Sequence, residues 1–437
     1  MTRPGQPASR RRHLPLALAA VVTATAILPA TVTATDDPAT AVLDWNANAV
    51  AALSNSSTAS PVGAGQPPQV ASVHVAMVQL AVYDAVNSIA ATGVPYLDGL
   101  PSAPPSASKP AAVATAAHHV LVGLTPALPQ AVLGWLDGAY GSSLAAIPDG
   151  AAKAAGVAAG AAAAAAMLDA RADDGRYGSF RFSTGTDPGE WRPVLPANVN
   201  DPNGWLAEVE PFSITSPGAY LTEGHLDMTS EAYAVEFDEV KTLGARNGSS
   251  RSLAQTTLAR FVTANPVVML SGGLRDVADA RDLSITEAAR LLGMTSMSGS
   301  DALIACWAAK EHWSFWRPIT AIRLADTDGN PATVAQPDWE PFFDTPPYPE
   351  HPSGYNCYTG GVMHAARAFF GTDHVAISLT NPAVGTREYD RLTRVVDDTI
   401  DGRIYTGFHF RTGDVQGAWI GKKVAQWVDR HELLPAD

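Results

Sequence analysis

Three short segments in the last third of the chain place cations and an imidazole among aromatic residues. The first reads KEHWSFWRP, and its Lys310 and Arg317 are separated by about two turns of a helix. This spacing predicts that both cations lie on one helical face. A lysine surrounded by tryptophans forms either cation–π contacts or a dry pocket for an anion.

The second segment is a loop that leads into an apolar helical stretch. It reads PEHPSGYN, and Pro352 and Ser353 are typical of the start of a helix. Backbone N–H groups at Ser353, Gly354 and Tyr355 are then expected to be free and to point at one spot. Gly354 would let an oxyanion come close to the backbone. The segment predicts either an anion site or an ordinary helix cap.

The third segment, RIYTGFH, joins an arginine to a histidine. Gly407 breaks helical continuity, so Arg403 and His409 are expected to project from a loop before the last helix. A neutral imidazole is a good nucleophile and a good metal ligand, whereas a single histidine in such a place is most often structural.

Taken in order, the three segments resemble the vanadium-dependent haloperoxidases and the type 2 phosphatidic acid phosphatases. The shared pattern is Lys-x6-Arg-Pro, then Pro-Ser-Gly, then Arg-x5-His. The WRPITAIR run at 316–323, Trp45-Asn46 and the AVYDA run at 81–85 are similar to the soluble, secreted haloperoxidase branch.

The resemblance implies an oxyanion pocket with vanadate as its cofactor and phosphate as the alternative occupant. His409 would supply the apical nitrogen, and Trp307 and Tyr348 would line the substrate pocket or pack in the core. Hydrogen peroxide would bind the vanadate, Lys310 would polarise it, and a halide or small organic substrate would be oxidised. The equatorial oxygens would be held by five groups: Lys310, Arg317, Ser353, the Gly354 amide and Arg403.

Two positions depart from the pattern of these families. Tyr355 replaces the usual histidine after Pro-Ser-Gly, and a tyrosine with a pKa of about 10 is a poor acid–base group near neutrality. His351 could compensate if the loop folds back. The families often place an aspartate four residues after the catalytic histidine, but here that residue is Gly413, and Asp414 would reach His409 only from a non-helical segment.

These departures leave three functions open. A vanadate-dependent peroxidase is favoured by the WRPITAIR run and the soluble helical context. The alternatives are a soluble acid phosphatase that forms a phospho-histidine at His409, and a non-catalytic oxyanion-binding protein.

The elements that must position these residues are helices. No long alternating run predicts a large sheet, and no glycine-rich nucleotide motif occurs. We therefore expect an all-α fold of packed helical bundles, with the oxyanion site in a bundle core and long irregular loops. The expected helices lie at 70–91, 110–122, 130–146, 150–171, 229–243, 251–264, 284–293, 300–316, 353–371, 385–400 and 413–430.

The 437 residues divide into three expected regions. Residues 1–34 have a basic start and a short apolar run, as in a signal peptide, so the protein is expected to be secreted. Their SRRRHL run fits a twin-arginine signal as well as an ordinary secretory one. An N-terminal helical region, 35–285, contains an irregular excursion at 172–228, and a C-terminal region, 286–437, carries the oxyanion site.

Composition limits the partners. The formal net charge of −14 argues against binding to nucleic acid or to an anionic membrane surface. The alanine-rich run 151–168 is the best candidate for a membrane span, but alanine is only weakly hydrophobic, so no integral membrane segment is expected in the mature chain.

The chain has two cysteines, which excludes a disulfide scaffold and a cysteine-rich metal site. Cys306 lies four residues before Lys310 and Cys357 four after Ser353, so the two sulfurs are expected to be close if both helices reach one pocket. They form either a disulfide, which an exported protein allows, or two buried free thiols.

Overall fold

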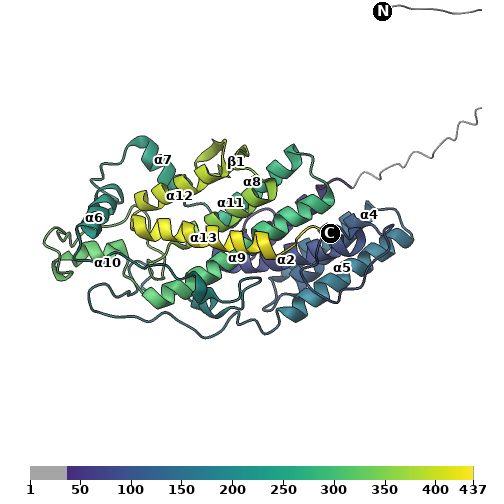
Figure 1. Cartoon of the computed structure of the whole chain (residues 1–437), viewed down its shortest axis with the longest axis horizontal. Coiled ribbons are helices and arrows are strands. Elements are labelled where there is room, and N and C mark those ends of the chain that lie inside the picture. The colour runs from purple at the N-terminus through teal and green to yellow at the C-terminus, as the bar shows by residue number, and fades with distance from the viewer. Residues whose placement is uncertain (1–36, 437) are drawn as a thin grey trace, which may run out of the picture. The chain divides into compact units, whose positions relative to one another are not determined.

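A computed structural model describes residues 37–436, and its regular structure is almost entirely helical (Figure 1). The prediction of an all-α fold is confirmed. The predicted signal peptide at 1–34 lies outside the described residues. The α-helices are α1 (Thr40–Ser54), α2 (Pro68–Ala90), α3 (Lys109–Gly123), α4 (Gln130–Ala145), α5 (Ala151–Ala170), α6 (Glu231–Leu243), α7 (Leu253–Phe261), α8 (Pro266–Ala280), α9 (Ile285–Trp313), α10 (Pro318–Arg323), α11 (Gly354–Phe370), α12 (Leu392–Tyr405) and α13 (Arg411–His431).

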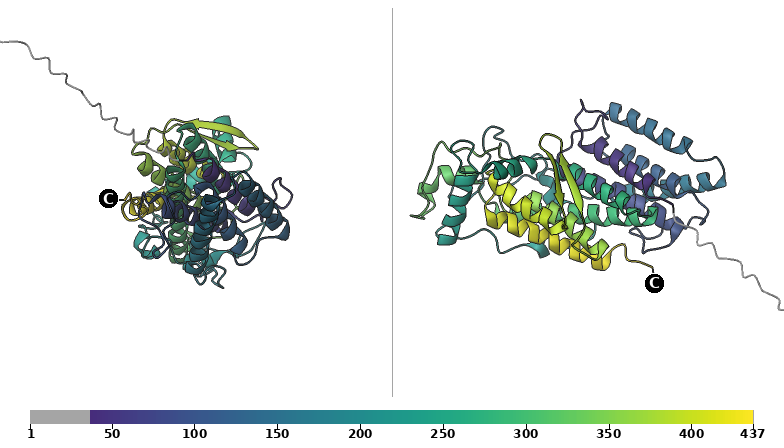
Figure 2. Two further views of the ribbon diagram at one scale, coloured as in Figure 1. Left: turned by 90° about the vertical axis from the view of Figure 1, so that its right-hand side faces the viewer. Right: turned by 90° about the horizontal axis from the view of Figure 1, so that it is seen from above.

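Helices α1, α3 and α5 pack around α2, which is apolar on every side and buried along nearly its whole length, and α4 packs against α3. Figure 2 shows these purple and blue helices grouped together. Small residues let α5 approach α3 closely. A Cβ atom at Gly156 would lie 2.2 Å from the Ser108 carbonyl oxygen, and one at Gly160 would lie 2.3 Å from that of Ala112.

The longest helix, α9, connects this group to the C-terminal helices. It begins with a capping box in which Ser284 and Glu287 satisfy each other's backbone N–H groups. It then packs against α2, α11 and α13. The prediction of two separate helices at 284–293 and 300–316 is wrong, because the polar residues between them are buried by neighbouring helices and the helix continues through them.

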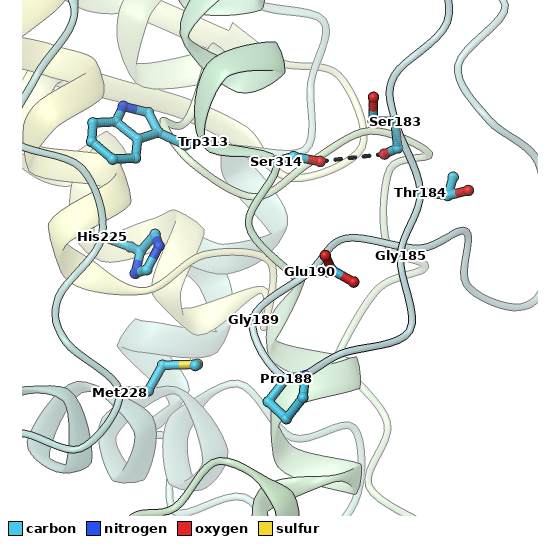
Figure 3. Close-up of a pocket in the computed structure, with 10 residues that line it drawn as sticks. All are labelled: Ser183, Thr184, Gly185, Pro188, Gly189, Glu190, His225, Met228, Trp313 and Ser314. Carbon is cyan, nitrogen blue, oxygen red and sulfur yellow. Dashed lines mark hydrogen bonds between the residues drawn. The ribbon is translucent and has the colours of Figure 1, made fainter.

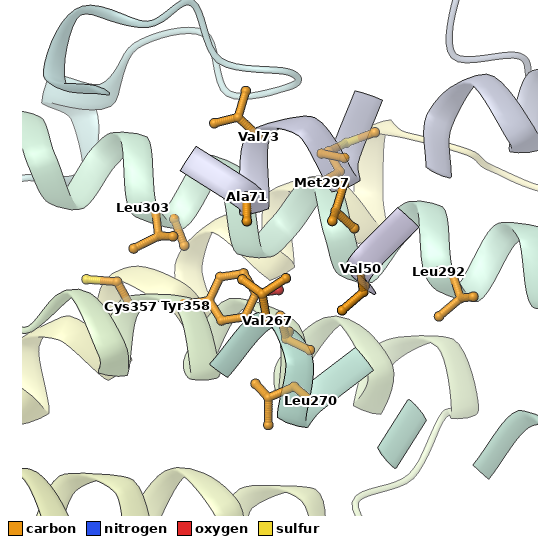
Figure 4. Close-up of a cluster of buried hydrophobic side chains, with 14 of the residues drawn as sticks. Val50, Ala71, Val73, Val267, Leu270, Leu292, Met297, Leu303, Cys357 and Tyr358 are labelled. Atoms are coloured by element: carbon orange, nitrogen blue, oxygen red, sulfur yellow. The ribbon is translucent and has the colours of Figure 1, made fainter. Parts of the chain in front are cut away.

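Apolar side chains from several helices fill the space around α9. Figure 4 shows part of this core, with residues from α1, α2, α8, α9 and α11 meeting in one cluster. The labelled members are Val50, Ala71, Val73, Val267, Leu270, Leu292, Met297, Leu303, Cys357 and Tyr358.

A short antiparallel hairpin, β1 (Ile377–Asn381) and β2 (Gly385–Tyr389), precedes α12. The predicted helix at 385–400 is therefore wrong in its first part, since residues 385–389 form a strand and the helix starts at Leu392. Helices α1, α8 and α10 were not predicted from the sequence.

Residues 172–228 contain only two short 3₁₀ turns, Gly204–Glu208 and Pro217–Tyr220. A buried carboxylate on α9 holds this excursion in place. Asp301 accepts hydrogen bonds from the backbone N–H groups of Phe212 at 2.7 Å, Ser213 at 2.8 Å and Ile214 at 3.0 Å. The expected division between residues 285 and 286 stays a prediction. It falls at the start of α9, which packs against helices of both regions.

Two of the described helices, α2 and α5, are long and apolar enough to cross a membrane. The apolar window of α2 is 89% buried in the protein and that of α5 is 33% buried. A buried core helix passes the same test, so the expected absence of a membrane segment stays a prediction.

Candidate active site

Lys310 is fully buried in the last turn of α9. Its ammonium donates hydrogen bonds to the carbonyl oxygens of Pro349 at 2.7 Å, Glu350 at 3.0 Å and Pro352 at 2.5 Å. Burial lowers the pKa of Lys310 to about 8. Lys310 therefore fastens the loop before α11 to the end of α9, and all three of its N–H groups have backbone partners.

Arg317 also lies beside the Pro349–Pro352 loop, but it does not lie on the helix that carries Lys310, contrary to the prediction. The helix ends at Trp313, Ser314 adopts a left-handed conformation with φ 40°, and Arg317 is the residue that precedes α10. The prediction that Lys310 and Arg317 share one helical face is therefore wrong. Arg317 is nevertheless fully buried. Its Nε donates to the Tyr348 carbonyl oxygen at 2.8 Å, and its Nη2 has no hydrogen-bond partner.

Two aromatic rings cover these cations. The centroid of the Tyr348 ring lies 5.1 Å from the Lys310 ammonium and 5.0 Å from the Arg317 guanidinium carbon. The Trp307 ring lies 5.7 Å from the Lys310 ammonium and 5.0 Å from the Tyr348 ring. Both predicted pocket aromatics are thus beside the cations, where ring faces favour positive charge.

Ser353 precedes α11 as its N-cap, in agreement with the predicted helix start. Its backbone N–H donates to the Gly413 carbonyl oxygen at 2.9 Å, so the prediction that this N–H is free is wrong. A Cβ atom at Gly354 would lie 2.7 Å from the Trp307 ring. Close packing of α11 on α9 therefore already requires glycine at this position.

Arg403 is also buried, but it lies in the last turn of α12 rather than in a loop, which corrects the prediction. Its guanidinium lies 4.9 Å from the Tyr355 ring and 4.6 Å from the Phe408 ring. Nη1 donates to the Val262 carbonyl oxygen at 3.2 Å, and Nε has no partner.

His409 lies in the loop between α12 and α13 and is held by hydrogen bonds on both ring nitrogens. Its Nδ1 is 2.9 Å from Glu350 Oε1, and its Nε2 is 3.2 Å from Arg317 Nη1. A guanidinium only donates, so Nε2 accepts and Nδ1 carries the proton. Burial and then the nearby cations, Arg317 first, lower the pKa of His409 well below its ordinary value. His409 is therefore neutral, with its Nε2 lone pair directed at the cations.

Glu350 was not among the residues predicted from sequence. It is fully buried and also accepts a hydrogen bond from the Phe410 backbone N–H at 3.2 Å. Burial raises the pKa of Glu350 to about 7. The partner expected for His409 was Asp414, which lies in α13 and accepts instead from Asn356 Nδ2 at 2.7 Å. The only sequence signal for Glu350 is its place beside the Pro-Ser-Gly motif.

Tyr355 and His351, the residues expected to stand in for the usual histidine after Pro-Ser-Gly, both form their hydrogen bonds away from the cations. Tyr355 donates from its hydroxyl to the Ala264 carbonyl oxygen at 3.2 Å, and burial raises its pKa. His351 contacts Thr222 Oγ1 through Nε2 at 3.3 Å, and its Nδ1 lies 3.9 Å from Glu350 Oε2. Burial lowers the pKa of His351 to about 3, so it is neutral near pH 7.

The electrostatics of the site favour a bound anion. Within residues 37–436, no carboxylate forms an ion pair with Lys310, Arg317 or Arg403. Burying three cations without an ion-paired carboxylate is costly, and each of the two arginines keeps an unpaired nitrogen. An oxyanion between these nitrogens and His409 Nε2 would supply both the charge and the hydrogen-bond acceptors.

A surface pocket of about 340 Å³ lies near the Glu350 side of the site (Figure 3). His225 and Trp313 form part of its wall, and the Trp313 ring lies 6.2 Å from that of His351. His225 also borders a gap of about 10 Å³ that Glu350 and His351 line. His225 therefore lies between the pocket and the buried pair Glu350 and His351.

Residues 290–434 match the family model described as the VCPO second helical-bundle domain. The vanadium chloroperoxidase of Curvularia inaequalis is 30% identical over 105 residues, which make up 22% of this chain and 16% of that relative. The aligned part is thus less than a fifth of the curated relative.

Solved structures extend the likeness to nearly the whole chain. A structure described as the first bacterial vanadium-dependent iodoperoxidase matches with a TM-score of 0.74 and 20% identity, covering 92% of this chain and 99% of that one. A holo-type bacterial vanadium-dependent chloroperoxidase matches with a TM-score of 0.68 and 18% identity, covering 84% and 93%. The predicted resemblance to the vanadium-dependent haloperoxidases is confirmed, by sequence for residues 290–434 and by fold for most of the chain.

Replacing Glu350 by alanine is expected to weaken vanadate binding by about 10- to 100-fold, because His409 would lose the acceptor that fixes its ring. Glu350→Gln keeps an acceptor oxygen and should lose less. Titration calorimetry with vanadate measures both, with Asp338→Ala, an exposed loop residue, as the control. Unchanged affinity in Glu350→Ala would show that the contact does not orient His409.

Proposed function

We propose that this chain is a vanadate-dependent peroxidase that uses hydrogen peroxide to oxidise a halide or a similar small nucleophile. One observation supports this proposal above the others. Lys310, Arg317 and Arg403 are buried without carboxylate partners around a neutral His409. A multiply charged tetrahedral oxyanion fits that arrangement, and vanadate is the cofactor of the chloroperoxidase and iodoperoxidase relatives by their names.

Each residue of the site would have a separate role in binding the oxyanion. Arg317 Nη2 and Arg403 Nε are unpaired and would donate to the oxyanion, and Ser353 Oγ and the Gly354 N–H would complete its support. His409 Nε2 would bind the vanadium atom. Vanadate, when bound, supplies the Lewis acidity that activates peroxide.

Lys310 and Glu350 would act on the groups around the oxyanion. The Lys310 N–H groups are taken up by carbonyl oxygens, so the lysine contributes its positive charge and holds the loop before Ser353. Glu350 keeps the proton of His409 on Nδ1, so the Nε2 lone pair, which accepts from Arg317 Nη1 in this structure, is available to a ligand that displaces that contact. The surrounding rings of Trp307 and Tyr348 keep water away from the cations.

Loading with each anion tests the proposal. Purified protein would be dialysed against vanadate or against phosphate, and each sample assayed for peroxide-dependent oxidation of iodide, bromide and chloride and for p-nitrophenyl phosphate hydrolysis. We expect halide oxidation only in the vanadate-loaded sample. Phosphoester hydrolysis without halide oxidation would identify a phosphatase instead. Tight anion binding with neither activity would identify a binding protein.

We also propose that residues 1–34 direct export of the protein. The support is the basic start and short apolar run of this segment. Expression of the full chain in a bacterial host, followed by mass spectrometry of the extracellular or periplasmic fraction, should find a mature chain that begins near residue 35. A full-length chain confined to the cytoplasm would contradict this.

A further inference from the structure

Helices α9 and α11 approach each other unusually closely beneath the oxyanion site. A Cβ atom at Gly361 of α11 would lie 2.6 Å from the Ser298 carbonyl oxygen of α9. One at Gly299 of α9 would lie 2.6 Å from the Tyr358 ring of α11. Because these glycines remove the side chains that would hold the backbones apart, neighbouring side chains of the two helices are forced together.

The two cysteines of the chain face each other across this contact. Cys306 on α9 and Cys357 on α11 are both free thiols with no exposed surface, and they lie close enough that each affects the pKa of the other. Cys306 Sγ also lies 3.5 Å from the Pro352 carbonyl oxygen, next to the loop that Lys310 fastens. Figure 4 shows Cys357 among the apolar residues of this layer, near Leu303.

The surroundings of the pair differ for its two members. Burial acts to raise the pKa of Cys306, but the interaction with Cys357, and then the charges of Lys310, one turn further along α9, and of Arg317, lower it. Burial raises the pKa of Cys357, which stays a thiol. One sulfur is thus disposed to attack an oxidant and the other to resolve the product.

We propose that Cys306 and Cys357 form a redox-active pair that hydrogen peroxide converts into a disulfide joining α9 to α11. The Cys306 thiolate attacks one peroxide oxygen, the O–O bond breaks, and a sulfenic acid and hydroxide result; the hydroxide takes up the proton that the Cys306 thiol released and becomes water. The Cys357 sulfur then attacks the sulfenic sulfur, the S–S bond forms, and a second water leaves. In sum, two thiols and one hydrogen peroxide give one disulfide and two waters, with sulfur oxidised and peroxide reduced.

The crosslink would tie together the two helices whose ends carry the site. Lys310 follows Cys306 by one turn, and Ser353 precedes Cys357 by one turn. A bond between the cysteines closes a loop that contains Lys310, Arg317, Glu350 and Ser353, so it restricts how far these residues can separate. It also removes two oxidisable thiols from a site that the proposed function would expose to peroxide.

The experiment starts from protein reduced with dithiothreitol, freed of the reductant and treated with a small excess of hydrogen peroxide. We expect intact mass spectrometry to show the loss of two hydrogen atoms, and alkylation after denaturation to label neither cysteine. The thermal midpoint should rise by about 5 °C, and dithiothreitol should reverse all three changes. No vanadate is added, so the result does not depend on whether the protein is a peroxidase.

Cys357→Ser and Cys306→Ser are the matched controls. Each single variant should show neither the loss of two hydrogens nor the rise in thermal midpoint after peroxide, and Cys357→Ser should instead gain oxygen at Cys306. Wild-type protein in which both thiols are still alkylated after peroxide, or in which both gain oxygen, would overturn the proposal. Because the decisive measurement is made on the wild-type chain, it stands even if a variant fails to fold.

Discussion

Replacing His409 by alanine is expected to reduce peroxide-dependent halide oxidation by about a thousandfold or more, while vanadate still binds. The neutral imidazole directs its Nε2 at Arg317, and the charges of Lys310 and Arg403 also act on the ring. Removing a residue that acts on the reacting atoms typically costs at least that much, whereas binding supplied by other groups remains. The three cations would still attract the oxyanion, so its affinity should fall less than the rate.

Steady-state oxidation of iodide and a vanadate titration, done on the same preparation, separate the two effects. His374→Ala is the matched control, since His374 is exposed on the segment between α11 and the hairpin. Its rate and affinity should equal those of the wild-type protein. If His409→Ala keeps full turnover, His409 has a structural role only and does not bind vanadium.

The helices of this fold could largely be predicted because most of them present an apolar stripe or are apolar all round. The central helix α2 is the clearest case, since a buried element needs no polar face. The errors occur where packing overrides local preference. The small polar residues near 294–299 suggested a break, but they are buried in the middle of α9. The strand at 385–389 was missed because a five-residue strand is too short for a periodic signal.

The site was predictable in its residue types and less so in its geometry. The seven-residue spacing of Lys310 and Arg317 suggested one helical face, but the chain leaves the helix at Ser314 and returns Arg317 to the same place. Glu350 could not be identified because a loop glutamate has no pattern. Its contact with His409 arises only when the Lys310 hydrogen bonds fold its loop back on α9. Tertiary structure brings these buried charges together, and their spacing along the chain does not predict which of them come into contact.

Replacing Tyr355 by histidine tests the largest departure of this site from the related families. In the structure the tyrosine ring covers the Arg403 guanidinium at 4.9 Å, and its hydroxyl donates to the Ala264 carbonyl oxygen. It therefore supplies no acid–base group to the oxyanion. A histidine would place an imidazole beside Arg403, with a pKa lowered from about 6.5 by burial and by the guanidinium.

If the protein is a peroxidase, Tyr355→His should raise halide oxidation by about a hundredfold, because a well-placed acid–base group typically contributes that much. The gain should be greatest below about pH 6, because an imidazole with a lowered pKa is protonated only there. Tyr355→Phe is the matched control: it removes only the hydroxyl, so neither rate should rise. A phosphatase would instead gain phosphoester turnover with halide oxidation at background. If neither rate changes in a vanadate-loaded Tyr355→His protein, position 355 does not limit catalysis. Low activity would then be explained by Lys310, because its hydrogen bonds to backbone carbonyl oxygens leave the ammonium no N–H group for the oxyanion.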